Sequence, residues 1–342
     1  MKKWGIIIFF ILMIPIFIFS NFHQKYWTIQ KNNNSWTFVS PNGKSIFING
    51  VTSVQPFQNG PKPPFYISKD FKNDNYEQWA KTTSKRIKEY GFSSIGAWSN
   101  QHLQKYIPYT KDLNILISCH NSIDNPEWEN EIDTIVKLQV EHLKNDQNLI
   151  GYYTDNELDW DKLKPYANKY FKTVYDKIKK YDSNHLILGV RFNKKPPKEV
   201  LIASKDYVDA HSFNQYLDHP YIPDTLQYTY ELTGKPIVIS EFSYFSDDNR
   251  SNNPNVFYNS NTNLFQGLVF NQKDRADNYE KFVLLCSETS YIIGTEFFQW
   301  NDEPAFGRYD GESYNFGIVD IYDNPYKELI NANIKIRIIL NH

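Results

Sequence analysis

Eight short apolar runs alternate with longer stretches of helical periodicity, and this alternation constrains the fold of the chain more than any other feature. The expected strands are 50–55, 93–98, 114–119, 149–154, 186–191, 207–213, 236–241 and 293–299, and the helical stretches include 76–90, 127–144, 162–181 and 275–289. Strand–helix alternation is typical of a parallel sheet covered by helices. Eight repeats predict the α/β class and a closed (β/α)8 TIM barrel, with a doubly wound open sheet as the alternative.

The sequence divides the chain into three segments. Residues 1–20 begin Met-Lys-Lys and continue as an apolar stretch, which predicts a signal peptide or an N-terminal membrane anchor. We therefore expect an exported protein that is secreted, periplasmic or anchored to the membrane. Residues 21–35 are expected to be a linker, and 36–342 the (β/α)8 barrel domain. This domain starts with two β-prone runs around a Pro-Asn-Gly turn, which predict a short N-terminal β-hairpin.

The connections between the expected elements differ in length according to their direction. Those that lead from a helix into the next strand are short, whereas those that leave a strand include the long segments 56–75, 242–273 and 301–324. In a parallel barrel all strand-to-helix connections lie at the carboxyl-terminal face, where enzymes of this fold build their active sites. The irregular residues of the chain are therefore expected on that face.

Two of the expected strands carry a glutamate at or just beyond their carboxyl ends. Glu157 follows the fourth strand, and Glu241 ends the seventh. Retaining glycosidases need two carboxyl groups about 5–5.5 Å apart, one as acid/base and the other as nucleophile. Strands four and seven lie on opposite sides of a barrel mouth, so we interpret Glu157 as the acid/base and Glu241 as the nucleophile. The alternative for each is an ordinary surface glutamate at the start of a loop.

The residues around both glutamates resemble a known group of enzymes. Asn156-Glu157 and Ile239-Ser-Glu-Phe242 are similar to the acid/base and nucleophile motifs of glycoside hydrolase clan A. Within that clan the segments 91–99, 153–158 and 307–317 resemble the agarase-like (family 50-type) glycosidases. The resemblance implies a retaining hydrolase that cleaves β-glycosidic bonds of a polysaccharide or oligosaccharide by double displacement, with an agarose-like β-galactan as the favoured substrate.

The same resemblance implies roles for further residues. The implied substrate-binding residues are Asn156, which would bind the sugar 2-hydroxyl, Trp98 and Trp300 as sugar platforms, and His120, His211, Asn214, Tyr216, Arg308 and Glu312. The alternatives are structural histidines, tryptophans of the core and charged residues that brace a loop. Many clan members carry an arginine near the end of strand two, but residues 93–100 contain none. Arg191 or Arg308 would then take its place.

Composition and motifs narrow the remaining function classes. The 37 basic and 39 acidic residues give a net charge of −2, which does not favour a nucleic-acid partner. The sequence shows no metal-ligand spacing, P-loop or glycine-rich dinucleotide motif, so we expect neither a metal nor another cofactor. The expected partner is a carbohydrate, and the apolar N-terminus would allow membrane association. A catalytically inactive glycan-binding barrel and a transglycosylase with the same covalent intermediate are the alternatives.

Overall fold

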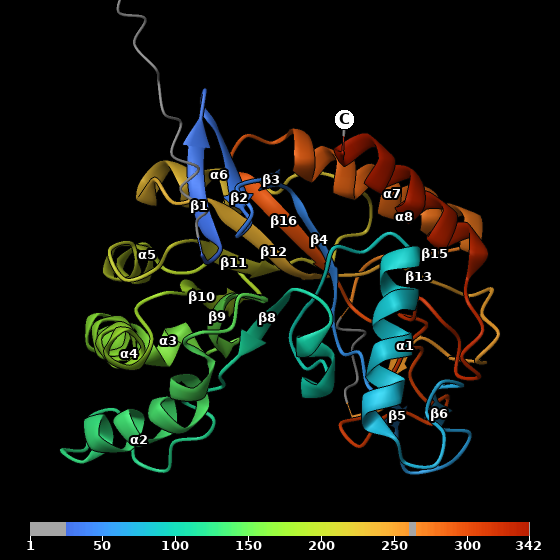
Figure 1. The fold of residues 1–342 in the computed structure, drawn as a ribbon, viewed down its shortest axis with the longest axis horizontal. Coiled ribbons are helices and arrows are strands. Elements are labelled where there is room, and N and C mark those ends of the chain that lie inside the picture. Colours follow the sequence, from blue (N-terminus) through green and yellow to red (C-terminus); the bar gives the residue numbers. More distant parts are fainter. Residues whose placement is uncertain (1–24, 260–264, 342) are drawn as a thin grey trace, which may run out of the picture.

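Eight parallel strands close into a barrel in the computed structural model, which describes residues 25–259 and 265–341 (Figure 1). Around the barrel the strands are β4 (Ile48–Val51), β7 (Ser94–Ile95), β8 (Tyr109–Asp112), β9 (Leu149–Asn156), β10 (Leu186–Phe192), β11 (His211–Asn214), β12 (Ile237–Phe242) and β16 (Ile292–Phe297). Each strand pairs with the next in chain order, and β16 closes the sheet against β4. The predicted TIM barrel is confirmed.

Helices pack around the outside of the barrel (Figure 1). They are α1 (Tyr76–Glu89), α2 (Trp128–Val140), α3 (Trp160–Leu163), α4 (Ala167–Tyr181), α5 (Lys198–Ser204), α6 (Asp224–Thr233), α7 (Gln272–Glu288) and α8 (Lys327–Leu340), with 3-10 turns at Gln101–Lys105, Glu141–Leu143 and Lys164–Tyr166. In α4 the buried positions Tyr170, Phe171, Val174 and Ile178 recur at helical spacing, so that one face packs on the barrel.

A small antiparallel sheet closes the amino-terminal end of the barrel. It consists of β1 (Thr28–Asn32), β2 (Ser35–Val39) and β3 (Ser45–Ile46). The β2–β3 pair is the predicted hairpin, whereas β1 lies inside 21–35, the segment expected to be a linker. Trp27 and Phe38 pack against apolar side chains from the starts of the barrel strands, among them Ile48, Ile150, Leu186, Val238 and Ile293. Covering these side chains removes apolar surface from water, which stabilises this end.

The third barrel strand lies earlier in the chain than the sequence predicted. Tyr109–Asp112 forms β8, while most of the apolar run 114–119 is a turn beyond it. Asn114 adopts φ +47°, which ends the extended conformation. The backbone amide of Leu116 then donates to the buried carboxylate of Asp155, at 2.8 Å. Tertiary contacts therefore hold this run as a loop although its composition favours a strand.

The long strand-to-helix connections carry three two-stranded sheets at the carboxyl-terminal face. These are β5 (Phe57–Gln58) with β6 (Tyr66–Ile67), β13 (Phe245–Ser246) with β15 (Leu268–Val269), and β14 (Val256–Phe257) with β17 (Glu312–Ser313). The last two pairs join residues that lie far apart in the sequence. The expected concentration of irregular structure on this face is confirmed, and the small sheets order it.

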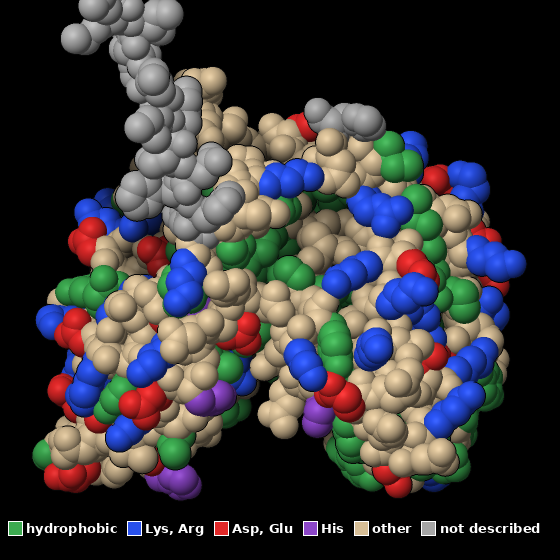
Figure 2. All heavy atoms as spheres, viewed as in Figure 1, with side chains coloured by type: hydrophobic (Ala, Val, Ile, Leu, Met, Phe, Trp, Pro, Cys, Tyr) green, Lys and Arg blue, Asp and Glu red, His purple; other side chains and the backbone are tan. Residues whose placement is uncertain are grey.

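The charges on the surface and the apolar character of the helices are relevant to the predicted partners and localisation of the protein. On the face drawn in Figure 2, basic and acidic side chains are interspersed. Of the helices in the described parts of the chain, none combines the length and the apolar character that a membrane span requires. The signal peptide or anchor predicted for 1–20 lies outside the described residues.

Candidate active site

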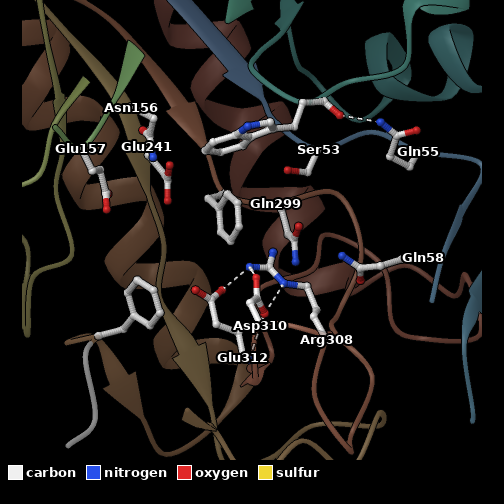
Figure 3. Close-up of a pocket in the computed structure, with 13 residues that line it drawn as sticks. Ser53, Gln55, Gln58, Asn156, Glu157, Glu241, Gln299, Arg308, Asp310 and Glu312 are labelled. Carbon is white, nitrogen blue, oxygen red and sulfur yellow. Dashed lines mark hydrogen bonds and ion pairs between the residues drawn. The ribbon is translucent and has the colours of Figure 1, made fainter. Parts of the chain in front are cut away.

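A cavity of about 450 Å³ opens at the carboxyl ends of the barrel strands (Figure 3). Its lining consists of Ser53, Gln55, Gln58, Trp98, Asn156, Glu157, Glu241, Phe265, Phe298, Gln299, Arg308, Asp310 and Glu312. Glu157, which directly follows β9, and Glu241, on β12, both line it. The barrel therefore brings the two glutamates singled out by the sequence into one cavity.

Glu241 is buried and accepts a hydrogen bond at each carboxylate oxygen. The Arg191 guanidinium donates to Oε2 at 2.7 Å, and the Tyr216 hydroxyl donates to Oε1 at 2.5 Å. Burial raises the pKa of Glu241 to about 7, while Arg191 opposes that rise. The positive charge of Arg191 at 2.7 Å favours the ionised form of this carboxyl group.

Glu157 is oriented by side-chain amides. Asn214 Nδ2 donates to Glu157 Oε1 at 2.8 Å, and Asn193 Nδ2 donates to Oε2 at 3.1 Å. The orientation of the Asn214 amide follows from its other contact, because its Oδ1 accepts from the Ser240 hydroxyl at 3.0 Å. Asn214 also donates to Asn156 Oδ1 at 3.1 Å. The Asn214 side chain therefore fixes the side chains of Asn156 and Glu157 relative to Ser240 on β12.

Arg191 connects the groups around both glutamates. Its guanidinium donates to Asn156 Oδ1 at 3.0 Å as well as to Glu241, and it lies 4.2 Å from the centre of the Trp98 ring. Of the two arginines considered as substitutes for the missing strand-two arginine, Arg191 is the one that contacts Glu241. Because the Asn156 oxygen accepts from Arg191 and Asn214, its Nδ2 remains as the donor for a ligand in the cavity.

Three of the lining residues have a left-handed backbone conformation. Ser53, Trp98 and Glu157 have φ values of +55°, +59° and +50°. Such conformations cost free energy in residues other than glycine, and they cluster at functional sites where the surrounding structure holds them. Trp98, the predicted second sugar platform, is partly exposed in the cavity and packs edge-on against Phe298, with ring centres 6.0 Å apart. Its free ring surface suits stacking on a sugar.

The opposite wall of the cavity is a charged cluster around Arg308 (Figure 3). Its guanidinium lies 2.6 Å from Glu312, 2.7 Å from Asp310 and 3.3 Å from the buried Glu303. Burial raises the pKa of Glu303 well above its usual value, while Arg308 opposes this shift. Arg308 and Glu312 line the cavity, and their mutual contact also braces the loop that carries them.

Three residues expected at the site lie elsewhere. His120 has a side chain 94% exposed, with its ring nitrogen 3.0 Å from Glu131, because the apolar run before it is a loop rather than strand three. His211 is the first residue of β11 and is buried at the amino-terminal end of that strand, beside Phe192. Trp300 is fully buried in the core, where its indole donates to the Tyr66 hydroxyl at 3.0 Å. It offers no ring face to a sugar in the cavity.

Two further predicted residues form hydrogen bonds with the glutamates but do not line the cavity. Asn214 and Tyr216 do not line the cavity, but they donate hydrogen bonds to Glu157 and Glu241 respectively. Within the described parts of the chain, no cluster of three or more His, Cys, Asp or Glu side chains has the arrangement needed to hold a metal ion.

Comparison with known proteins assigns the family. The sequence model of the glycosyl hydrolases family 2 TIM-barrel domain matches residues 85–305. The chain belongs to this family. Solved structures support the fold of this family 2 barrel. An agarase superposes with a TM-score of 0.77 at 19% identity, covering 92% of this chain and 63% of that one. A family 2 β-galacturonidase from Eisenbergiella tayi superposes with a TM-score of 0.58 at 16% identity, covering 90% and 54%.

Two similar proteins are named as agarases of Vibrio sp. (strain JT0107). Beta-agarase B is 25% identical over 352 residues, which cover 74% of this chain and 35% of that protein. Beta-agarase A is 32% identical over 194 residues, which cover 54% and 18%. This chain therefore matches only about a third or less of the length of each of these two relatives. The resemblance to agarase-like glycoside hydrolases agrees with these matches.

Several lining residues of the family 2 barrel were not anticipated. They are Ser53, Gln55, Gln58, Phe265, Phe298 and Gln299. Most of them follow a barrel strand within a few residues, which is the one sequence signal that could have found them. Their types alone do not distinguish them from other polar or aromatic loop residues.

A carboxyl group buried inside the barrel, that of Glu296, allows the structure to be tested through protein stability, without a substrate. Glu296 on β16 reaches across the interior to Thr110 on β8, whose hydroxyl donates to it at 2.6 Å. A Cβ atom at Gly96 would lie 2.4 Å from Glu296 Oε2, so only glycine fits there. Burial raises the pKa of Glu296 from 4.5 to about 7. The Glu296 carboxyl group therefore binds its proton more tightly in the native state than in the unfolded chain.

The Glu296→Gln variant should make stability less sensitive to pH. The contribution of protonated Glu296 is fully present below pH 4.5 and is lost as the pH rises through about 7. Wild type should therefore lose up to about 3 kcal/mol more unfolding free energy between pH 5 and pH 8 than the variant, whose side chain stays neutral. Denaturant unfolding of both proteins at these pH values measures the difference, and equal pH dependence would contradict the assignment.

Proposed function

We propose that this protein is a retaining glycoside hydrolase that cleaves β-glycosidic bonds, with Glu241 as nucleophile and Glu157 as acid/base. The supporting observation is that the two glutamates line one cavity in different surroundings. Glu241 accepts hydrogen bonds from a guanidinium and a phenol. Among the described residues, two side-chain amides donate to the carboxyl group of Glu157. An arginine favours the carboxylate that a nucleophile requires, and an amide environment is compatible with a proton donor.

The proposed reaction proceeds in two displacements. Glu241 attacks the anomeric carbon while Glu157 protonates the departing glycosidic oxygen, which leaves a covalent glycosyl-enzyme. Glu157 then takes a proton from water, which attacks the anomeric carbon and releases Glu241. Asn156 Nδ2 is the donor placed to bind the sugar 2-hydroxyl, a contact that strengthens in the oxocarbenium-like transition state. Trp98 provides an aromatic surface for the sugar ring beside these groups.

An agarose-like β-galactan is the substrate that we favour. The support comes from the relatives named as β-agarases and from the segments 153–158 and 307–317, which resemble agarase-like enzymes. Incubation of purified protein with agarose, porphyran, β-galactan and β-glucan oligosaccharides, followed by product analysis, tests this choice. An initial product that keeps the β configuration supports double displacement. Retained binding without turnover on every glycan would favour an inactive glycan-binding barrel instead.

The activity of the wild-type protein should fall on the acidic side of neutral pH. Glu241 must be ionised to attack, so the rate should fall on the acidic side as the pH drops below the pKa of Glu241, which burial raises to about 7. Measurement of kcat/KM from pH 4 to pH 10 follows this fall, and a rate that does not fall between pH 7 and pH 5 would contradict this assignment.

A further inference from the structure

The exposed aromatic side chains of the described residues all lie in strand-to-helix connections. They are Phe57, Trp98, Tyr221, Tyr258, Phe270, Phe306, Tyr309 and Tyr322. By contrast, exposed aliphatic side chains also occur on the outer helices, as with Leu138 on α2 and Ile338 on α8. Single exposed apolar residues are ordinary on protein surfaces. The restriction of the aromatic ones to the face that holds the cavity is what calls for an explanation.

Two of these aromatic residues lie within two positions of lining residues in the chain. Phe306 and Tyr309 are 52% and 76% exposed, and they lie on either side of Arg308 in the chain. Tyr309 also precedes Asp310, so that it stands between two lining residues. The loop that carries these two exposed rings is therefore the loop that supplies the charged wall of the cavity.

The loop that carries both rings is held by its own hydrogen bonds. The amide of Gly307 donates to Pro304 O at 2.8 Å, and that of Gly311 donates to Arg308 O at 2.9 Å. Gly307 has φ +84°, a conformation that favours glycine. Two further connections pack against the loop. The Tyr258 hydroxyl donates to the carbonyl of Ala305 at 3.1 Å, and the ammonium of Lys62 lies 5.6 Å from the centre of the Phe306 ring.

We propose that Phe306 and Tyr309 form an outer sugar-binding position, beyond the Arg308 wall, for a glycan chain whose cleaved bond lies at Glu157 and Glu241. This inference rests on the proposed function and adds that the substrate is longer than the cavity itself holds. The ligand class is a chain of sugar units with apolar C–H faces, because these faces stack on aromatic rings and need no charge. A rigid loop that displays two rings binds such a chain with little ordering cost.

The experiment compares a short and a long substrate. We expect the double variant Phe306→Ala/Tyr309→Ala to lower the ratio of kcat/KM on an agarose hexasaccharide to that on an aryl β-glycoside by about tenfold, the effect of losing two stacking contacts. Tyr309→Phe keeps the ring and should keep the ratio. Leu138→Ala, at a residue that is 73% exposed on α2, is the matched control and should change neither rate. An unchanged ratio in the double variant would overturn the inference.

A binding measurement separates this inference from the proposed function. Calorimetric titration of hexasaccharide into wild type and into the double variant should show about tenfold weaker binding to the variant, whether or not the sugar is cleaved. If wild type binds the hexasaccharide without cleaving it and the double variant binds about tenfold more weakly, the proposed catalysis fails and the outer position stands. Equal affinity of both proteins, or no binding to wild type, overturns the outer position.

Discussion

Glu241→Gln is expected to lower kcat by at least about 10⁴-fold and to leave the fold intact. Glutamine keeps the shape of the side chain and can still contact Arg191 and Tyr216, but it cannot form the glycosyl-enzyme. Loss of the nucleophile or of another triad residue in a serine protease costs about 10⁴–10⁶ in kcat. Steady-state kinetics on an aryl β-glycoside measures the loss, and circular dichroism and thermal unfolding check the fold.

Chemical rescue identifies the role of Glu241 more directly than loss of activity does. Glu241→Ala leaves space beside the anomeric carbon, so added azide should restore turnover and yield a glycosyl azide of inverted configuration. Glu288→Gln, at an exposed glutamate that ends α7, is the control and should behave as wild type. A Glu241→Gln variant with more than a tenth of the wild-type rate would exclude the covalent mechanism.

Glu157→Gln is expected to discriminate between leaving groups. The acid must protonate a poor leaving group such as a sugar hydroxyl, so the rate on an oligosaccharide should fall by about 10²–10⁴-fold. A dinitrophenyl glycoside needs almost no protonation, so its glycosylation step should slow by less than about tenfold. Pre-steady-state measurement of phenol release from glycosides with leaving groups of different pKa gives this dependence.

The steepness of that dependence decides the assignment of the acid. In Glu157→Gln the rate of glycosylation should decline strongly as the leaving-group pKa rises, whereas wild type should show a shallow slope. Asn193→Ala removes a donor to Glu157 and keeps the carboxyl group, so its slope should stay close to that of wild type. Equal slopes in wild type and in Glu157→Gln would assign proton donation to another residue.

Apolar periodicity and the lengths of the connections indicate where most of the barrel strands lie and which residues stand at their ends. The eight-fold alternation identified the barrel, and the carboxyl ends of the fourth and seventh strands placed Glu157 and Glu241 on one face. The predicted position of strand three is wrong. The run 114–119 has a strand-like composition, but the left-handed Asn114 and the contact with Asp155 hold it as a loop. The expectation for His120 failed with it, since that residue follows the misplaced strand.

The tryptophans show a second kind of limit. Trp98 and Trp300 both follow barrel strands, so their positions in the sequence do not distinguish them. Trp98 is partly exposed in the cavity, whereas Trp300 is fully buried, with its indole donating to Tyr66. The direction of a side chain depends on the local φ values and on neighbours from distant segments. The residue type indicates neither of them.

By itself the sequence determined the barrel and the face on which its glutamates lie, because apolar periodicity and loop length act locally and repeat eight times. Only the tertiary structure decided that Arg191 pairs with Glu241, that Asn214 orients Glu157, and that Arg308 meets three carboxylates. Those contacts join residues from different strands and loops. Their formation depends on distances across the barrel mouth, which closure of the sheet sets and which no local pattern encodes.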